Sequence, residues 1–257
     1  MCRHARKQGG RTMFKAIRNH YFRDMINRMN DLETAVHVLT GSPVYVPGNG
    51  VGMNGSMYRK RIFGELLRMF DFSFVLETGT YLGDSTGYFA EASNLPVFSS
   101  DINPVLHSLA MMRLKGRPGI HLVHSDSRKF LEEMSANREV VQKECFFYLD
   151  AHWGKDCPLA EEISIIASRW PKFVVMVDDF QVPGDPGYAY DRCGMSKWIN
   201  LSLIRKSVKG HDLGVYFPSA PSGEESLSGK PKGFVMLAKN GEYGDRLETL
   251  SLLRRHR

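Results

Sequence analysis

The segment VLETGTYLGDSTGYF, Val75 to Phe89, begins as an apolar strand, breaks into a turn with two glycines and continues as the start of a helix. A strand, a glycine turn and a helix in this order form a cradle for a ligand. The first turn of the helix presents unpaired N–H groups, and glycine lets the backbone approach the ligand closely. The sequence therefore predicts a ligand at this turn.

The residues of the turn argue against a phosphate ligand. Tyr81 stands where the dinucleotide fingerprint GxGxxG needs a second glycine against the pyrophosphate. Gly79 and Gly83 are one residue too close together for a P-loop, and Asp84 replaces its lysine. Because Asp84 and Glu77 would repel phosphate, the turn favours a ligand with cationic groups, such as the sulfonium and ammonium of S-adenosylmethionine.

Outward from this turn, short apolar strands alternate with helices. The predicted strands are 74–77, 97–101, 120–124, 145–149 and 173–177, and the predicted helices are 59–70, 85–93, 104–114, 128–136 and 159–169. Two later strands, 213–217 and 233–237, have no helix between them and predict an antiparallel hairpin at an edge. The fold class predicted is a Rossmann-like, doubly wound α/β fold, with a mostly parallel seven-stranded sheet and helices on both faces.

Polar residues follow the ends of the predicted strands. Asp101 ends the second strand, 22 residues after Gly79, where a carboxylate can accept hydrogen bonds from ribose hydroxyls. The later strands are followed by Ser125-Asp126-Ser127, Asp150 and Asp178-Asp179. In such a sheet the ligand lies outside the carboxyl ends of the strands, so these side chains are the candidates for chemistry.

The chain from Phe74 to Phe180 resembles the class I S-adenosylmethionine-dependent methyltransferases, in particular the metal-dependent O-methyltransferases of the catechol and bacterial sugar or macrolide types. ETGTYLGDS matches the ExGxYxGxS loop of the catechol group at Glu77, Gly79, Tyr81, Gly83 and Ser85. The resemblance implies that this loop binds the methionine end of the cofactor, with Ser85 at its carboxylate. It also implies that Asp101 binds the ribose and that Asp126 and Ser127 lie at the adenine.

The segment LDAHWGKD, Leu149 to Asp156, resembles the LDHWKD segment of the catechol enzyme, with Ala151 and Gly154 as extra residues. The resemblance implies that Trp153 lies beside the adenine or the acceptor. The proton of the acceptor hydroxyl passes to a base, for which His152 and Lys155 are both candidates.

The resemblance also implies a divalent metal ion. In the family one Asp ends the fourth strand and an acidic pair, or Asp-Asn, ends the fifth, and Asp150, Asp178 and Asp179 occupy these places. Three neighbouring carboxylates suit a hard ion such as Mg²⁺ or Mn²⁺. A cation that coordinates the acceptor hydroxyl lowers its pKa and so activates it for methyl transfer.

The positive charge of the chain is concentrated at the N-terminus. Residues 1–30 hold eight Lys or Arg and one Asp, a net charge of +7, whereas the whole chain carries +6 and the remaining 227 residues about −1. A body without excess positive charge disfavours a nucleic-acid substrate. We expect a basic, disordered leader over 1–12, with Met1 or Met13 as the start, and a methyltransferase domain over 57–257.

Between them, residues 13–56 are expected to form an N-terminal helix over 13–32 and a loop over 42–56 near the site. The apolar residues of the helix fall at spacings of three and four, which predicts an amphipathic helix. It would pack on its own domain or on a second copy of the chain, and contact with a membrane surface is the alternative.

Four cysteines, Cys2, Cys145, Cys157 and Cys193, show no paired spacing, and the sequence contains no long apolar run. These features predict a reducing, cytoplasmic location.

The sequence predicts an S-adenosylmethionine-dependent O-methyltransferase that acts on a hydroxyl of a sugar, glycan or small natural product. Specificity would reside in residues 42–56, 181–198 and 218–232, outside the common core. Two alternatives stay open: another nucleotide-binding enzyme of Rossmann-like fold, and a catalytically silent binding protein with a methyltransferase-like fold.

Overall fold

The computed structural model describes residues 52–152, 156–194, 197–225 and 231–256. They belong to a unit that spans Val46–Arg257. The predicted leader, the predicted N-terminal helix, most of the predicted loop 42–56 and the residues Trp153 and Lys155 lie outside the described residues.

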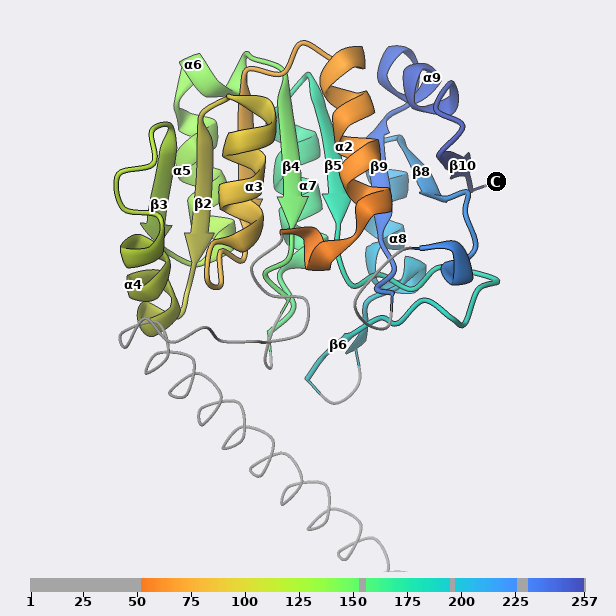
Figure 1. Ribbon diagram of the computed structural model, residues 1–257. Helices are drawn as coiled ribbons and strands as arrows, with labels where there is room; N and C mark the ends of the chain where they lie inside the picture. The colour runs from red at the N-terminus through yellow and green to blue at the C-terminus, as the bar shows by residue number, and fades with distance from the viewer. Residues whose placement is uncertain (1–51, 153–155, 195–196, 226–230, 257) are drawn as a thin grey trace, which may run out of the picture. The chain divides into compact units, whose positions relative to one another are not determined.

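A mixed sheet forms the centre of this unit (Figure 1), and its order is β10-β8-β9-β5-β4-β1-β2-β3. Its five parallel strands are β1 (Phe74–Thr78), β2 (Val97–Asp101), β3 (Ile120–His124), β4 (Cys145–Leu149) and β5 (Phe173–Val177). The remaining strands are β8 (Leu213–Pro218), β9 (Val235–Lys239) and β10 (Leu253–Arg255). The predicted doubly wound fold is thus confirmed, with two corrections at one edge.

The first correction is that the sheet of the described residues has eight strands rather than seven. The second is that the hairpin of β8 and β9 pairs as expected, but the short strand β10 pairs antiparallel with β8 and forms the edge in its place. Because β10 has the sequence LRR, it offers neither an apolar run nor a clear alternation from which a strand could be predicted.

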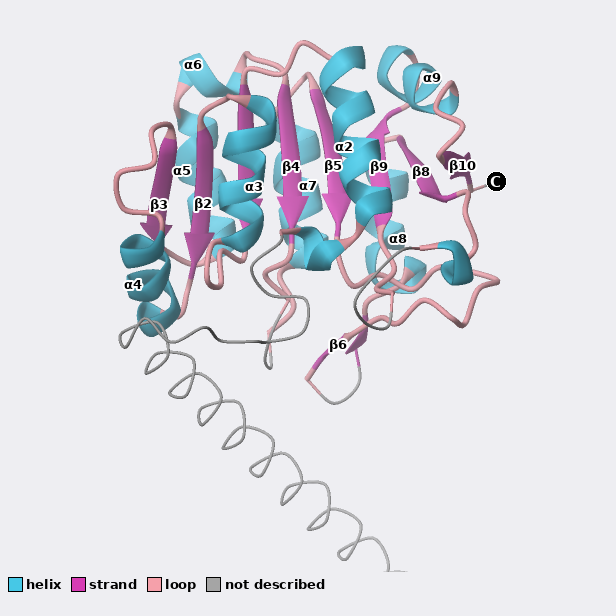
Figure 2. Cartoon of the chain, viewed as in Figure 1, coloured by secondary structure: helices cyan, strands magenta, loops and turns pink. Residues whose placement is uncertain are grey.

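Helices cover both faces of the sheet, as Figure 2 shows. In chain order they are α2 (Met57–Met69), α3 (Asp84–Ser93), α4 (Pro104–Arg113), α5 (Ser127–Ala136), α6 (Arg138–Val141), α7 (Leu159–Arg169), α8 (Leu201–Gly210) and α9 (Glu242–Glu248). Single turns of 3₁₀ helix occur at η1 (Met53–Gly55) and η2 (Ser222–Glu224). No helix in the described part of the chain is long and apolar enough to cross a membrane.

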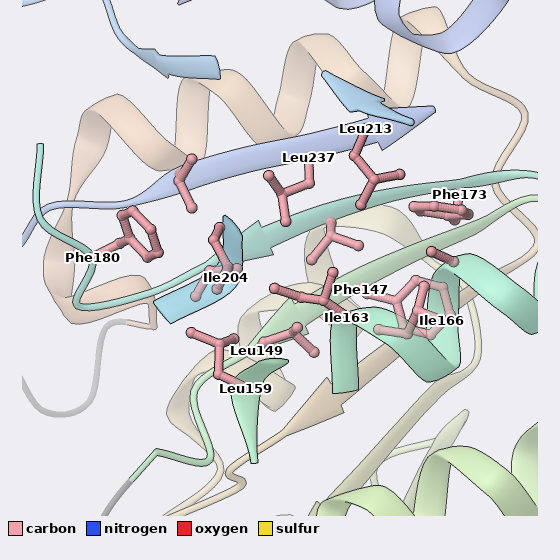
Figure 3. Packing of buried hydrophobic residues seen from close by; sticks show 14 of the residues in the cluster. Phe147, Leu149, Leu159, Ile163, Ile166, Phe173, Phe180, Ile204, Leu213 and Leu237 are labelled. Carbon is pink, nitrogen blue, oxygen red and sulfur yellow. The ribbon is translucent and has the colours of Figure 1, made fainter. Parts of the chain in front are cut away.

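An apolar core lies on each face of the sheet, between the strands and the helices that cover them, because successive residues of a strand point to opposite faces. Phe147 and Leu149 of β4 pack with Ile163 and Ile166 of α7 on one face, and Figure 3 shows this cluster. Tyr148, between those two β4 residues, belongs to the cluster on the other face, with residues of α2 and α3. The burial of β4 and β5 on both faces explains why these two strands could be predicted from continuous apolar runs.

Two cysteines that the sequence left unpaired form a disulfide, Cys157–Cys193. The separation of 36 residues gives no local pattern, so only the fold brings the two side chains together. The bond joins the segment after β4 to a small antiparallel ladder of β6 (Arg192–Cys193) and β7 (Lys197–Trp198). This ladder lies beyond the carboxyl ends of the parallel strands (Figure 1).

Candidate functional site

The glycine turn lies where the strand order reverses, because β1 has β2 on one side and β4 on the other. Gly79 donates its N–H to the carbonyl oxygen of Ser100 at 2.8 Å, and its φ is +90°. A Cβ at Gly79 would lie only 2.5 Å from the carbonyl oxygen of Asp150. The turn that was predicted to bind the cofactor therefore approaches Asp150, which was predicted to bind the metal ion at the acceptor.

Gly79→Ala is expected to lower the free energy of unfolding by about 1–3 kcal/mol, because the new Cβ meets backbone and φ is positive. Gly116→Ala is the matched control, since Gly116 also has a positive φ of +79° but nothing within 4 Å of a Cβ. Urea unfolding of both variants separates the overlap from the backbone strain. Equal losses in the two variants would contradict the close approach at Gly79.

Glu77 is buried beneath the turn. The hydroxyls of Thr86 and Ser99 donate to its Oε2, the latter at 2.6 Å, while its Oε1 has no hydrogen-bond partner among the described residues. Burial raises the pKa of Glu77 to about 7, against the opposing effect of the two hydroxyls. One carboxyl oxygen thus stays available to a donor that the described residues do not supply.

Asp101 is held in place by two backbone groups. The N–H of Tyr81 donates to its Oδ2 at 2.7 Å and the N–H of Asn103 donates to its Oδ1 at 2.8 Å. Burial raises the pKa of Asp101 above its usual value. The next residue, Ile102, is 67% exposed, so the carboxylate stands at the edge of an open surface with a second lone pair free on each oxygen.

Ser85 accepts a hydrogen bond from the N–H of Met53 at 2.9 Å. Met53 lies in a left-handed turn over residues 52–55, in which all four φ angles are positive, from +50° to +74°. The side-chain amide of Asn54, in the same turn, donates to Oδ2 of Asp178 at 3.0 Å. This turn therefore joins the cofactor loop to the end of β5, and residues 52–56 of the predicted loop lie at the site.

Asp126 and Ser127 lie at the start of α5, but local partners already engage Asp126. Its carboxylate caps the helix by accepting from the N–H of Arg128, and it accepts from two guanidinium nitrogens of the same residue at 2.8 and 3.0 Å. These hydrogen bonds hold the pKa of Asp126 below its usual value. Ser127 is buried, next to Glu162. The geometry thus favours a helix cap over the predicted adenine contact for Asp126.

Asp178 does not join the predicted metal ligands. It forms a buried ion pair with Arg59 of α2, whose Nη1 lies 2.5 Å from Asp178 Oδ1, and both side chains are fully buried. The hydroxyl of Tyr148 donates to Oδ2, and the N–H of Asp179 donates to Oδ1 at 2.6 Å. Because both oxygens already accept two hydrogen bonds each, we correct the predicted metal set by removing Asp178.

Asp150, His152 and Asp179 form the cluster that could hold a metal ion, with one ligand atom from each within 4.8 Å of the others. His152 Nε2 lies 3.6 Å from Asp150 Oδ1 and 4.0 Å from Asp179 Oδ2. Burial lowers the pKa of His152 to about 4, and neither ring nitrogen has a hydrogen-bond partner among the described residues. Burial and the mutual repulsion of the carboxylates raise the pKa values of Asp150 and Asp179 well above the usual range.

Lys232 and Asp191 also belong to this cluster. They lie in the segments 218–232 and 181–198, which were predicted to govern specificity, but neither residue was singled out in the sequence. Lys232 Nζ lies 3.0 Å from Asp179 Oδ1 and 3.1 Å from Asp191 Oδ1. Arg59 was missed as well, since it was predicted only as the first residue of a helix. In the sequence, Lys232 and Arg59 cannot be distinguished from the many lysines and arginines that are exposed. Only the fold shows which groups their charges face.

No model of a known protein family matches the chain, and no curated protein does. Solved structures do match. One is a putative O-methyltransferase from Klebsiella pneumoniae, at 16% identity and a TM-score of 0.52, over 82% of this chain and 89% of that one. Another is the cofactor-bound protein Rv0187 from MTB, at 16% identity and a TM-score of 0.53, over 82% and 91%.

At this identity the comparison concerns the fold alone. The predicted Rossmann-like fold is therefore confirmed: the chain shares its fold with these two solved structures, one of which is described as a putative O-methyltransferase.

Proposed function

We propose that this protein is an S-adenosylmethionine-dependent O-methyltransferase that acts on a hydroxyl of a sugar, glycan or small natural product, with Mg²⁺ or Mn²⁺ at the acceptor. The observation that carries the proposal is the contact between the glycine turn, where the cofactor would bind, and the acidic cluster, where the acceptor would bind. Gly79, in the cofactor turn, approaches the backbone of Asp150, which belongs to the cluster with His152 and Asp179. A methyl donor in the turn would therefore lie beside an acceptor at the cluster.

The residues of the turn fit S-adenosylmethionine, which supplies a methyl group on a sulfonium. The free oxygen of Glu77 suits a cationic donor, and Asp101 has lone pairs for the two ribose hydroxyls. Gly79, Gly83 and Ser85 complete the turn. Glycine suits position 83 because its φ is +78° and because a Cβ there would lie 2.5 Å from Leu114 Cδ1. Exposed Ile102 offers an apolar surface next to the ribose position.

Asp101→Ala tests the cofactor half of the proposal. It is expected to weaken S-adenosylhomocysteine by about 1.5–3 kcal/mol, because two charge-assisted hydrogen bonds to the ribose are lost. Asp71→Ala is the control, since Asp71 is exposed and lies before β1, at the opposite end of that strand. Isothermal titration calorimetry measures both, and an unchanged affinity in Asp101→Ala would remove this residue from the site.

The acidic cluster fits a divalent cation. Asp150 and Asp179 provide carboxylate oxygens, and Asp150 Oδ1 has no hydrogen-bond partner among the described residues. Burial first and repulsion between carboxylates second raise the pKa values of both residues, and a cation would offset that repulsion. Such an ion supplies Lewis-acid activation of the acceptor hydroxyl. Lys232 holds the other oxygen of Asp179, so this residue would keep its orientation when the acceptor binds.

His152 is the proposed base. As the acceptor oxygen forms its bond to the methyl carbon, the bond from that carbon to sulfur breaks, and the hydroxyl proton passes to Nε2. The lowered pKa keeps the ring neutral at pH 7, so one ring nitrogen has a free lone pair. Asp150 and Asp179, at 3.6 and 4.0 Å from Nε2, would stabilise the cation that forms. Lys155, the other candidate, and Trp153 lie outside the described residues.

The cytoplasmic location stays a prediction, and the Cys157–Cys193 disulfide argues against it, because such bonds are rare in a reducing cytosol. Counting free thiols in protein purified under alkylating conditions would decide between a reducing, cytoplasmic location and an oxidising one. Self-association and membrane contact through residues 13–32 also stay predictions.

A further inference from the structure

His152 lies beside two carboxylates whose backbones are fixed by hydrogen bonds. The N–H of Asp150 donates to the carbonyl oxygen of Thr78, at the end of β1, at 2.8 Å. The carbonyl oxygen of Asp179 accepts from the N–H of Asp191 at 3.0 Å. Both acidic residues are therefore held in place by neighbouring segments of the chain.

His152 itself lacks such support. Among the described residues, its backbone forms no N–H···O hydrogen bond, and neither ring nitrogen has a partner. The residue is nevertheless only 2% exposed, and Nε2 lies 3.6 Å from Asp150 Oδ1. A buried polar ring without hydrogen bonds keeps its place through packing and through restraint of the segment that carries it.

The Cys157–Cys193 disulfide provides a restraint at this position. The Sγ of Cys193 lies 3.7 Å from the carbonyl oxygen of His152, and because this sulfur is bonded to Cys157 it has no proton to donate. Cys157 follows His152 by five residues, and both cysteines are almost fully buried. The same bond thus packs on the backbone of His152 and restrains the segment that follows it.

The other half of the bond lies on a ladder that is held at the acidic cluster. Cys193 ends β6, which pairs with β7. The N–H of Ile199, one residue after β7, donates to the carbonyl oxygen of Asp191, one residue before β6, at 3.1 Å. Because Asp191 also donates its N–H to Asp179, the ladder is tied to that residue. The disulfide therefore fixes the segment of His152 relative to Asp179.

We propose that the Cys157–Cys193 bond positions the proposed base by holding His152 beside Asp150 and Asp179. This inference rests on the proposed function, because it concerns the base of that reaction. Proton transfer requires a base within hydrogen-bonding reach of the acceptor hydroxyl, and a displacement of about 1 Å can cost about 10²-fold in rate. The two cysteines are thus positioning residues, which act through His152.

Acylation of histidine by diethyl pyrocarbonate tests the proposal, because the reagent needs access to a ring nitrogen. In the wild-type chain loaded with S-adenosylhomocysteine, with EDTA present so that no cation shields the ring, His152 should react at least tenfold more slowly than exposed His121. In Cys157→Ala/Cys193→Ala the rate at His152 should rise tenfold or more. Mass spectrometry of the peptides gives both rates, and an unchanged rate at His152 overturns the proposal.

Single variants distinguish the bond from the volume of the side chains. Cys157→Ala and Cys193→Ala should each raise the rate at His152 as much as the double variant, because either change removes the bond. Val140→Ala, the control, removes packing from the same apolar cluster and leaves the bond intact, so His152 should stay protected. A rise in only one single variant, or an equal rise in Val140→Ala, assigns the protection to packing and overturns the role of the bond.

Two readouts show whether the change is local. In the double variant, the buried thiol of Cys145 should stay unreactive toward iodoacetamide. The affinity for S-adenosylhomocysteine should stay within threefold of wild type, since Gly79 and Asp101 are held by hydrogen bonds of their own. Loss of either readout shows general damage and overturns the positioning role.

The cofactor affinity of the wild-type chain distinguishes failure of this inference from failure of the proposed function. A wild-type chain that binds S-adenosylhomocysteine, but whose His152 reacts as fast as in the double variant, overturns the positioning role alone. A wild-type chain that does not bind S-adenosylhomocysteine overturns the proposed function, and the positioning role with it.

Discussion

Removal of the divalent cation, or the substitution Asp150→Asn, is expected to slow methyl transfer by about 10²-fold or more, if metal activation and positioning lower the barrier by ~3 kcal/mol. S-adenosylhomocysteine should still bind within a few-fold of wild type. The reason is geometric, since the proposed cofactor contacts lie on the ends of β1 and β2, whereas Asp150 and Asp179 lie on the ends of β4 and β5. Turnover of an accepted hydroxyl substrate and calorimetry with the cofactor product measure the two effects separately.

Asp71→Asn is the control for the loss of one carboxylate, because Asp71 is exposed and lies outside the cluster. His152→Ala separates the two roles available to the imidazole. If His152 is the base, the variant should be slow but should still bind Mn²⁺, as measured by electron paramagnetic resonance. If His152 is a metal ligand, the variant should lose Mn²⁺ as well. Full turnover in excess EDTA, with metal-free protein verified by elemental analysis, would refute the metal mechanism.

Arg59→Met should lower the free energy of unfolding by about 3–5 kcal/mol, the usual cost of leaving the partner of a buried ion pair uncompensated. Arg59 and Asp178 are both fully buried, and the second guanidinium nitrogen of Arg59 donates to the carbonyl oxygen of Lys232 at 2.6 Å. The variant therefore loses a hydrogen bond as well as a charge. A lower urea midpoint with an unchanged slope of the unfolding curve would be the measured result.

Two comparisons identify the charge as the cause. Arg61→Met, at an exposed position of the same helix, should cost less than about 0.5 kcal/mol. Arg59→Met/Asp178→Asn should be more stable than Arg59→Met alone, because no unpaired charge stays buried. Equal stability of the single and double variants would refute the ion-pair argument and assign the loss to packing, including the contact of the guanidinium with the Phe234 ring at 5.5 Å.

Four of the five parallel strands could be predicted to the residue, and β1 was predicted one residue too short. Strands 97–101, 120–124, 145–149 and 173–177 and helix 159–169 were predicted with the bounds that the structure has. Strands β4 and β5 are continuous apolar runs because helices cover both faces of the sheet there, whereas β2 and β3 also contain polar residues. The later elements α8, α9 and β10 were not predicted. α9 and β10 are short, whereas α8 carries an amphipathic pattern from which a helix could have been predicted.

The position of the site could also be predicted, because the carboxyl ends of parallel strands meet at one edge of the sheet whatever the side chains are. Glu77, Gly79, Asp101, Asp150 and Asp179 all lie at that edge in the structure. The turn also predicted the class of ligand, because Tyr81 and Asp84 argue against a phosphate.

The roles of Asp178 and Asp179 could only be assigned from the tertiary structure. The two are adjacent in sequence, yet Asp178 lies against Arg59, 119 residues away, whereas Asp179 has a φ of +51° and lies beside His152 and Lys232. The Cys157–Cys193 bond and the Asp191–Lys232 pair arise in the same way, from contacts between separate loops. Local sequence determined the strands, the helices and the edge at which they end, because those depend on burial and backbone conformation. Which charged groups meet at that edge was decided by the packing of α2 and the loops, because the energy of a buried charge depends on neighbours that are distant in the chain.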